Sequence, residues 1–251
     1  MARKRNEEKE EEFIGFGDQE IYQELKSVVN KQIPNSAFIL GDDDAPNIVN
    51  DFISLGSYQL DTIISNKADK GGAPVGRITE ISGLNSSGKS LIAIEACRAT
   101  QRKNGICLYI DTENATSLEW LVNLGLDPKR LVYIQVQTTE EVFQTVESVV
   151  GHLLEKYKGK KTRPIITIIW DSVAQTSTQA ENEGSYSDMQ MASQAKVIGK
   201  GIRKITQFLG ASNVCFIILN QLKMKMNVPN KYSDPYCVDP YTTEIEILCH
   251  Q

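Results

Sequence analysis

The sequence lacks the features that mark a membrane or secreted protein. No apolar run among its 251 residues approaches the roughly 18–20 needed to cross a bilayer, and the charged start MARKRNEEKEEE has no apolar stretch for a signal peptide. The five Cys residues are scattered, odd in number and without a CxxC pair, which argues against a disulfide framework and a zinc site. We therefore expect a protein of the reducing cytosol with no membrane partner.

Acidic residues are missing from one long segment. The 43 residues from Met189 to Lys231 contain no Asp or Glu but seven Lys and Arg. Since the whole chain carries a net charge of −5, the remainder carries −12. A segregated basic segment can bind a polyanion even on an acidic protein, because steering and counterion release act locally. The alternative is a basic helix face that only contacts solvent.

The chain divides by composition into four parts. Residues 1–17 form a charged start that we expect to be disordered. Residues 18–50 hold a short amphipathic helix, with apolar residues at helical spacing up to Pro34, and a lone strand candidate at 36–41. This helix and strand are too small to bury themselves, so we expect them to dock on another copy of the chain. Residues 51–236 form the core, and residues 237–251 are considered separately below.

The core alternates apolar strands with helices. Such alternation is typical of an α/β fold in which a mainly parallel sheet is covered by helices on both faces. The predicted strands are residues 77–82, 106–111, 132–136, 165–171 and 214–220, and the predicted helices are 89–103, 117–124, 140–158 and about 190–210.

A phosphate-binding motif follows the first of these strands. Residues 83–90, GLNSSGKS, match G-x-x-x-x-G-K-[ST] and lie between a predicted strand and a predicted helix, as the motif requires. Its backbone N–H groups would face phosphates, Lys89 would neutralise the β- and γ-phosphates, and Ser90 would hold Mg²⁺. The nucleotide-binding candidates are Gly83, Leu84, Asn85, Ser86, Ser87, Gly88, Lys89 and Ser90.

Polar residues end three other strands. Asp171 ends the apolar strand IITIIWD, where an acidic residue can hold Mg²⁺. Glu113 follows the strand over 106–111, where a carboxylate can activate the attacking water, with Asp111 as the competing candidate. Gln221 closes the last clear strand and can contact a γ-phosphate; the alternative is a polar residue that only ends a strand.

Together these motifs resemble the RecA family of homologous-recombination ATPases, in its bacterial members and in its phage (UvsX-like) members. The resemblance runs from about residue 18 to 236. GLNSSGKS resembles the family's Walker A motif, YIDTE its catalytic-glutamate segment and IWDSVA its Walker B segment. The resemblance implies a RecA-like P-loop NTPase core preceded by an N-terminal helix–strand polymerisation arm, in the cytoplasm of a bacterium or of a phage host.

The resemblance also implies roles for further residues. It makes Glu113 the catalytic base and Gln221 the nucleotide sensor, and it places Trp120 where the family stacks an aromatic ring on adenine. Ser117 departs from the family, which usually carries an Asp there to read the base edge. The implied DNA-binding residues are Met191, Lys196, Lys200, Arg203, Lys223, Met224 and Lys225.

The implied function is an ATP- and Mg²⁺-dependent recombinase, a DNA-dependent ATPase. It would form a homo-oligomeric filament on single-stranded DNA and then engage duplex DNA for strand exchange and repair. One alternative is a helicase-like RecA-fold motor, which a closed ring would favour. The other is a recombination mediator that binds DNA without turnover; intact Lys89, Glu113 and Asp171 argue against it.

After Tyr236 the sequence departs from the family. Residues 237–251 resemble the first block of an intein, with a starting Cys followed by a TTEIEIL strand. Cys237 would attack the carbonyl of Tyr236 to form a thioester, and a second polypeptide would carry the rest of the intein and of the core. The alternative is a divergent loop and strand with an ordinary Cys. Because basic residues that the family uses at the neighbouring subunit's ATP lie beyond this point, the isolated chain is expected to hydrolyse ATP weakly.

Overall fold

The computed structural model describes residues 19–34, 36–40, 49–67, 69–114, 116–160, 162–184, 191–210, 212–222 and 245–250. The chain divides into two units, Met1–Ile48 and Val49–Gln251, and each is described by itself.

Among its described residues, the first unit contains one helix, α1 (Gln19–Gln32), close to where the apolar spacing predicts it. No residue of α1 is buried, and its apolar face, including Ile21 and Leu25, is exposed. The strand expected over 36–41 is not found in residues 36–40, because no described strand pairs with them. The side-chain amide of Asn30 instead holds this segment beside α1. Its nitrogen donates to the carbonyl of Ala37, and its oxygen accepts from the backbone N–H of Ala37.

The second unit is built on a six-stranded sheet. Its order is β5-β4-β6-β7-β3-β8, and every neighbouring pair is parallel except β3 and β8, which are antiparallel. The strands are β3 (Ile78–Gly83), β4 (Ile106–Asp111), β5 (Leu131–Gln135), β6 (Ile166–Asp171), β7 (Val214–Gln221) and β8 (Ile245–His250). The predicted α/β fold with a mainly parallel sheet is therefore confirmed.

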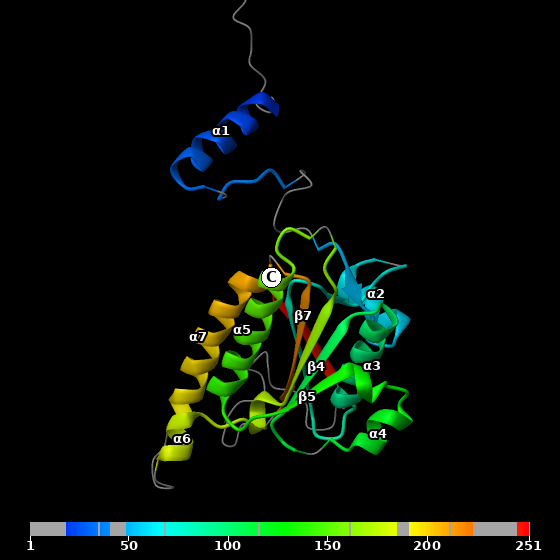
Figure 1. Ribbon diagram of the computed structural model, residues 1–251. Helices are drawn as coiled ribbons and strands as arrows, with labels where there is room; N and C mark the ends of the chain where they lie inside the picture. Colours follow the sequence, from blue (N-terminus) through cyan, green and yellow to red (C-terminus); the bar gives the residue numbers. More distant parts are fainter. Residues whose placement is uncertain are drawn as a thin grey trace, which may run out of the picture. The chain divides into compact units, whose positions relative to one another are not determined.

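Helices cover both faces of this sheet (Figure 1). One apolar cluster joins α3 to one face and another joins α5 and α7 to the other. β6 shows why its sequence is almost entirely apolar: Ile169 belongs to the first cluster and Trp170 to the second, so both faces are buried. The helices of this unit are α2 (Tyr58–Ser65), α3 (Lys89–Arg102), α4 (Leu118–Asn123), α5 (Thr139–Lys156), α6 (Gln179–Glu183) and α7 (Met191–Leu209).

Short elements complete the second unit. They are the antiparallel pair β1 (Phe52–Ile53) and β2 (Ala73–Pro74) and the 3₁₀ turns η1 (Pro128–Arg130) and η2 (Val173–Gln175). The polar segment after Gln175, which lies outside the predicted strands and helices, contains the short helix α6. This helix forms because Thr178 and Glu181 make a capping box that satisfies the first free N–H groups. No helix among the described residues is long and apolar enough to span a bilayer.

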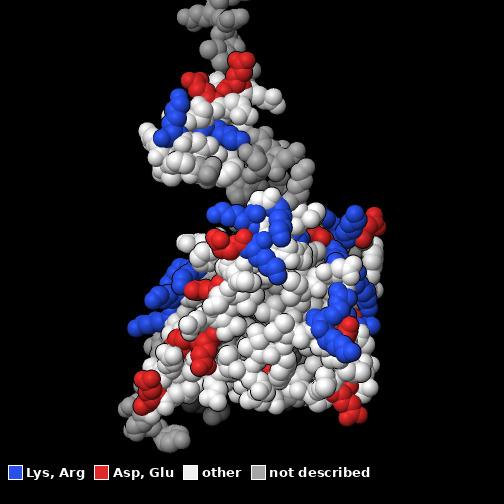
Figure 2. All heavy atoms as spheres, viewed as in Figure 1, with Lys and Arg blue, Asp and Glu red and all other residues white. Residues whose placement is uncertain are grey.

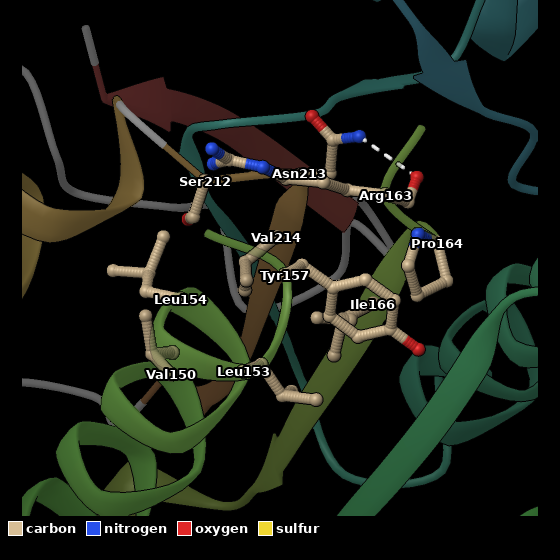
Figure 3. Close-up of a pocket in the computed structure, with 10 residues that line it drawn as sticks. All are labelled: Val150, Leu153, Leu154, Tyr157, Arg163, Pro164, Ile166, Ser212, Asn213 and Val214. Carbon is tan, nitrogen blue, oxygen red and sulfur yellow. Dashed lines mark hydrogen bonds between the residues drawn. The ribbon is translucent and has the colours of Figure 1, made fainter. Parts of the chain in front are cut away.

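A small pocket lies where β6 and β7 begin, beside the end of α5 (Figure 3). Its lining is mostly apolar, with Leu153, Leu154 and Tyr157 from the α5 side. Asn213 closes one side by donating from its amide to the carbonyl of Arg163 at 3.1 Å. Because parallel strands end at the opposite edge of the sheet, this pocket is separate from the polar residues that follow the strand ends.

Candidate nucleotide-binding site

The segment that matches the phosphate-binding motif joins β3 to α3, between a strand and a helix as the motif requires. Gly88 caps α3 with φ +96°, a left-handed conformation that glycine adopts without strain, and Ser86 also has positive φ. Lys89 is almost buried, and its ammonium donates to the carbonyls of Gly83 at 3.0 Å and Leu84 at 2.7 Å. The lysine therefore closes the loop on itself in this structure.

Burial and the neighbouring carboxylates have opposite effects on the pKa of Lys89. Burial penalises the charged form and lowers the pKa of Lys89 below its ordinary value, while Asp171 and Glu113 oppose that shift. A polyanionic phosphate would act in the same direction as these carboxylates and favour the charged lysine.

Asp171 meets Ser90 at the loop. The Ser90 hydroxyl donates to Oδ2 of Asp171 at 2.8 Å, and the Tyr109 hydroxyl donates to the same oxygen at 2.6 Å. Burial raises the pKa of Asp171, and these two hydrogen bonds oppose the rise. Hydroxyl and carboxylate oxygens are the ligands that Mg²⁺ prefers, so the two predicted metal residues fit that ion.

Glu113 lies at the centre of a second set of contacts. Its Oε1 accepts a hydrogen bond from the Ser172 hydroxyl at 2.5 Å and another from the Gln221 amide at 2.9 Å. The oxygen of that amide accepts from Gln175 at 3.3 Å. The structure thus brings together the predicted base and the predicted sensor, from the ends of β4 and β7.

Asp111, the competing base, is used differently. It is 1% exposed and accepts from the Tyr133 hydroxyl, the backbone N–H of Glu113 and the backbone N–H of Thr116. Burial alone would raise the pKa of Asp111, but the hydrogen bond from Tyr133 and those from the backbone outweigh it and the pKa is lowered. A carboxylate held by three donors is a poor proton acceptor, so the geometry favours Glu113.

Trp120 lies on α4 and is 38% exposed, which leaves ring surface free for stacking. Ser117 begins this helix, and its hydroxyl accepts from the backbone N–H of Trp120 at 3.2 Å. Its role in the structure is therefore that of an N-cap.

Comparison with known proteins agrees with this geometry. The family model described as RecA N-terminal domain matches residues 19–237. The chain belongs to the RecA family. Its similar relatives include proteins named "Protein RecA" from Cereibacter sphaeroides (34% identical over 175 residues, 70% of this chain and 47% of the relative) and Wolbachia sp. subsp. Brugia malayi (35% over 178 residues, 71% and 46%). The chain thus spans about half the length of the curated relatives it matches.

The DNA-binding residues predicted from the RecA family are only partly within the described structure. Lys196, Lys200 and Arg203 lie on α7, where Figure 2 shows Lys and Arg side chains gathered along the helix. Lys204 on the same helix pairs with Glu147 of α5 at 2.6 Å. Met191 begins α7, but only its backbone is described. The other predicted residues, Lys223, Met224, Lys225 and Cys237, lie outside the described residues.

Sequence reasoning missed four residues whose side chains donate hydrogen bonds to predicted or competing strand-end residues: Tyr109 to Asp171, Tyr133 to Asp111, Ser172 to Glu113 and Gln175 to Gln221. The two tyrosines lie in strands and look like core residues, while Ser172 and Gln175 look like turn residues. A signal existed for the tyrosines, because Tyr109 lies two residues before Asp111 and therefore on the same face of β4.

Proposed function

We propose that this chain is the ATP-binding core of a recombinase that uses ATP and Mg²⁺ to assemble on single-stranded DNA. The observation that carries the proposal is the contact set at the strand ends. There the phosphate-loop residues Lys89 and Ser90 lie with the carboxylates Asp171 and Glu113 and with the amide of Gln221. This set contains a group for each task of phosphoryl transfer: holding phosphate, holding metal, orienting water and sensing the γ-phosphate.

Each residue has a proposed role in hydrolysis. Lys89 leaves its carbonyl partners and neutralises the phosphates, while Ser90 and Asp171 would hold Mg²⁺, which supplies positive charge at the phosphate oxygens. Glu113 orients and activates the attacking water. Gln221 reports the γ-phosphate to the DNA-binding segment that begins after it. Trp120 provides a stacking surface for the base.

The first unit is proposed to join copies of the chain into a filament. The apolar face of α1 is unburied, and residues 36–40 have no strand partner among the described residues. An unpaired extended segment and an exposed apolar helix face are what docking on a neighbouring copy requires. In this arrangement ATP lies between neighbours.

The basic segment from Met189 to Lys231 is proposed to hold DNA. Lys196, Lys200 and Arg203 contribute from α7, and binding should weaken with salt as phosphate contacts are lost. Single-stranded DNA binds first and a duplex is then tested for homology.

The test of the proposed function compares two lysine variants. Lys89→Ala removes a charge-assisted phosphate contact and should weaken binding of a fluorescent ATP analogue by about 10- to 100-fold. Lys129→Ala is the matched control, because Lys129 is exposed and lies outside the site. Electron microscopy of the wild-type chain with an ATP analogue and single-stranded DNA should show open filaments. Equal nucleotide affinity in the two variants would refute the assignment, and closed rings would favour the helicase-like motor.

The same preparations test the expected weak hydrolysis. Phosphate release by the isolated chain should stay slow with single-stranded DNA, although nucleotide binds. Rapid DNA-stimulated turnover would contradict this expectation.

Splicing at Cys237 is a second candidate activity, and the observation that favours it is that the family match ends at residue 237. The alternative, a divergent strand of the core, is favoured by β8, which pairs with β3 in the core sheet. An excess of a small thiol separates the two. A thioester at Tyr236 would be cleaved to a fragment ending there, detected by mass spectrometry and lost in Cys237→Ala. An intact wild-type chain would leave the ordinary-strand interpretation.

A further inference from the structure

Two tyrosines on neighbouring strands each hold a carboxylate. Tyr109 of β4 and Tyr133 of β5 are cross-strand partners, and their rings stack with centroids 6.3 Å apart and an interplanar angle of 14°. The Tyr109 hydroxyl donates to Asp171 at 2.6 Å, and the Tyr133 hydroxyl donates to Asp111 at 2.6 Å. The two side chains therefore make the same type of contact one strand apart.

The sheet register explains this pattern. Asp111 and Asp171 are directly opposite each other at the ends of β4 and β6. Like charges at such positions repel, and each carboxylate needs donors to remain there. Tyr109 lies two residues before Asp111 and reaches diagonally across to β6, and Tyr133 reaches in the same way from β5 to β4. The diagonal neighbour is within reach of a long aromatic side chain.

Tyr109 is suited to a fixed position. Its side chain is 0% exposed and packs in the apolar cluster between α3 and the sheet. A tyrosine hydroxyl is protonated at neutral pH, so it remains a donor to the Asp171 carboxylate. A buried ring in a strand has few alternative rotamers, so the direction of this hydrogen bond is set by the core.

Asp171 receives two donors on one oxygen. Oδ2 accepts from Ser90 on α3 and from Tyr109 on β4, which fixes the carboxylate against the hydroxyl with which it is proposed to hold metal. Partners of this kind orient a metal-binding group without touching the metal.

We propose that Tyr109 is a positioning residue for the Mg²⁺ site, whose hydroxyl holds the Asp171 carboxylate beside Ser90. This inference rests on the proposed function, in which Asp171 and Ser90 hold Mg²⁺. It extends that function by one residue that neither the phosphate-binding motif nor the strand-end carboxylates include.

The test measures metal affinity directly. Mn²⁺ replaces Mg²⁺ as a paramagnetic probe and is titrated into the full chain with ADP, with free Mn²⁺ followed by electron paramagnetic resonance. Tyr109→Phe keeps the ring but removes the donor, and should weaken Mn²⁺ binding by about 10-fold or more, the usual effect of losing such a partner. Affinity for ADP without metal should be unchanged, because the Tyr109 hydroxyl donates to Asp171, which is proposed to hold metal.

Tyr133→Phe is the matched control. It removes an equivalent hydrogen bond of 2.6 Å from the neighbouring strand, but its carboxylate, Asp111, is not proposed to hold metal. Mn²⁺ affinity should therefore stay within about 2-fold of the wild type, since Asp171 keeps its hydrogen bonds from Ser90 and Tyr109 in this variant. An equal loss in both variants would assign the effect of Tyr109 to general packing and overturn the proposal.

Two further variants separate the possible failures. If Asp171→Asn leaves Mn²⁺ affinity unchanged, the metal assignment in the proposed function is wrong and the inference falls with it. If Asp171→Asn weakens Mn²⁺ binding and Tyr109→Phe does not, only the inference is wrong. Incorporation of 4-aminophenylalanine at position 109 restores a donor at the same place and should recover part of the lost affinity. If Tyr109→Phe does not fold, this substituted chain decides the outcome, since its weaker donor should give an affinity below that of the wild type.

Discussion

Gln221→Ala should separate nucleotide binding from DNA binding. In the structure the amide of Gln221 donates to Glu113 at 2.9 Å and accepts from Gln175 at 3.3 Å. One of the two N–H donors of this amide is used on Glu113, and in the proposed function the bond to Glu113 is exchanged for a bond to the γ-phosphate.

The contacts set the size of the effect. A hydrogen bond to a charged group contributes about 1.5–3 kcal/mol. The bond to Glu113 is partly exposed and belongs at the lower end of that range, while a bond to a γ-phosphate in a closed site belongs nearer the upper end. Their difference is about 1 kcal/mol, which is about a 5-fold change in an equilibrium constant for each subunit. This lies at the low end of allosteric coupling energies, and it multiplies along a filament.

The assay is fluorescence anisotropy of a labelled single-stranded oligonucleotide, with and without a slowly hydrolysed ATP analogue. For the wild type, the analogue should increase DNA affinity by at least about 5-fold, and for Gln221→Ala the ratio should fall to near one. Nucleotide binding should be retained with at most about a 5-fold loss of affinity for the ATP analogue, because Lys89 and Ser90 are unchanged. Gln144→Ala is the control, since Gln144 is an exposed amide on α5 away from the site. A nucleotide-dependent ratio that Gln221→Ala leaves unchanged would refute the reasoning.

Two further predictions concern assembly and pH. Leu25→Glu places a charge on the apolar face of α1, where Leu25 is 56% exposed. Because burying this charge at an interface is costly, the variant should lose nucleotide-dependent assembly, measured by light scattering, and keep nucleotide binding. Assembly equal to that of the wild type would contradict docking through this face. Asp111→Asn weakens three hydrogen bonds and should lower the free energy of unfolding at neutral pH by about 1–3 kcal/mol. Because the pKa of Asp111 is lowered on folding, its stabilisation is present above the unfolded value of about 3.9 and is lost as the pH falls through the folded value. The difference in free energy of unfolding between wild type and variant, measured in urea, should therefore narrow as the pH falls below about 3.9; a difference that stays constant would contradict this prediction.

The fold could be predicted from sequence because its strands are buried on both faces. IITIIWD and VCFIILN leave no exposed side to carry polar residues, and such runs separated by helices have few other solutions than a covered parallel sheet. The same reasoning does not hold for the strand predicted at 36–41, which the structure does not form in residues 36–40. A strand exists only with a partner, and the described part of the chain supplies none.

The candidate site was predictable at the strand ends and not within the strands. Asp171 and Gln221 follow apolar runs, and parallel strands bring their carboxyl ends to one edge. Tyr109 and Ser172 depend on register, because their partners are 62 and 59 residues away in sequence. The pairing of β4 with β6 decides which side chains meet, and that pairing is set by tertiary packing rather than by any local motif.

In the proposed function, the contacts at the site would also let the protein distinguish ATP from ADP. Lys89, Ser90 and Gln221 each make a hydrogen bond to another group of the protein, and breaking such a bond without replacing it would cost about 1–3 kcal/mol. A ligand that binds here exchanges these hydrogen bonds for its own. Only a ligand that offers a new partner to each of the three residues recovers the free energy of the bonds that it breaks. A diphosphate can replace the carbonyl partners of Lys89, but it has no γ-phosphate to replace Glu113 as the partner of Gln221. The two nucleotides thus differ in the contacts they offer to one residue, and a conformational change can follow only from such a difference.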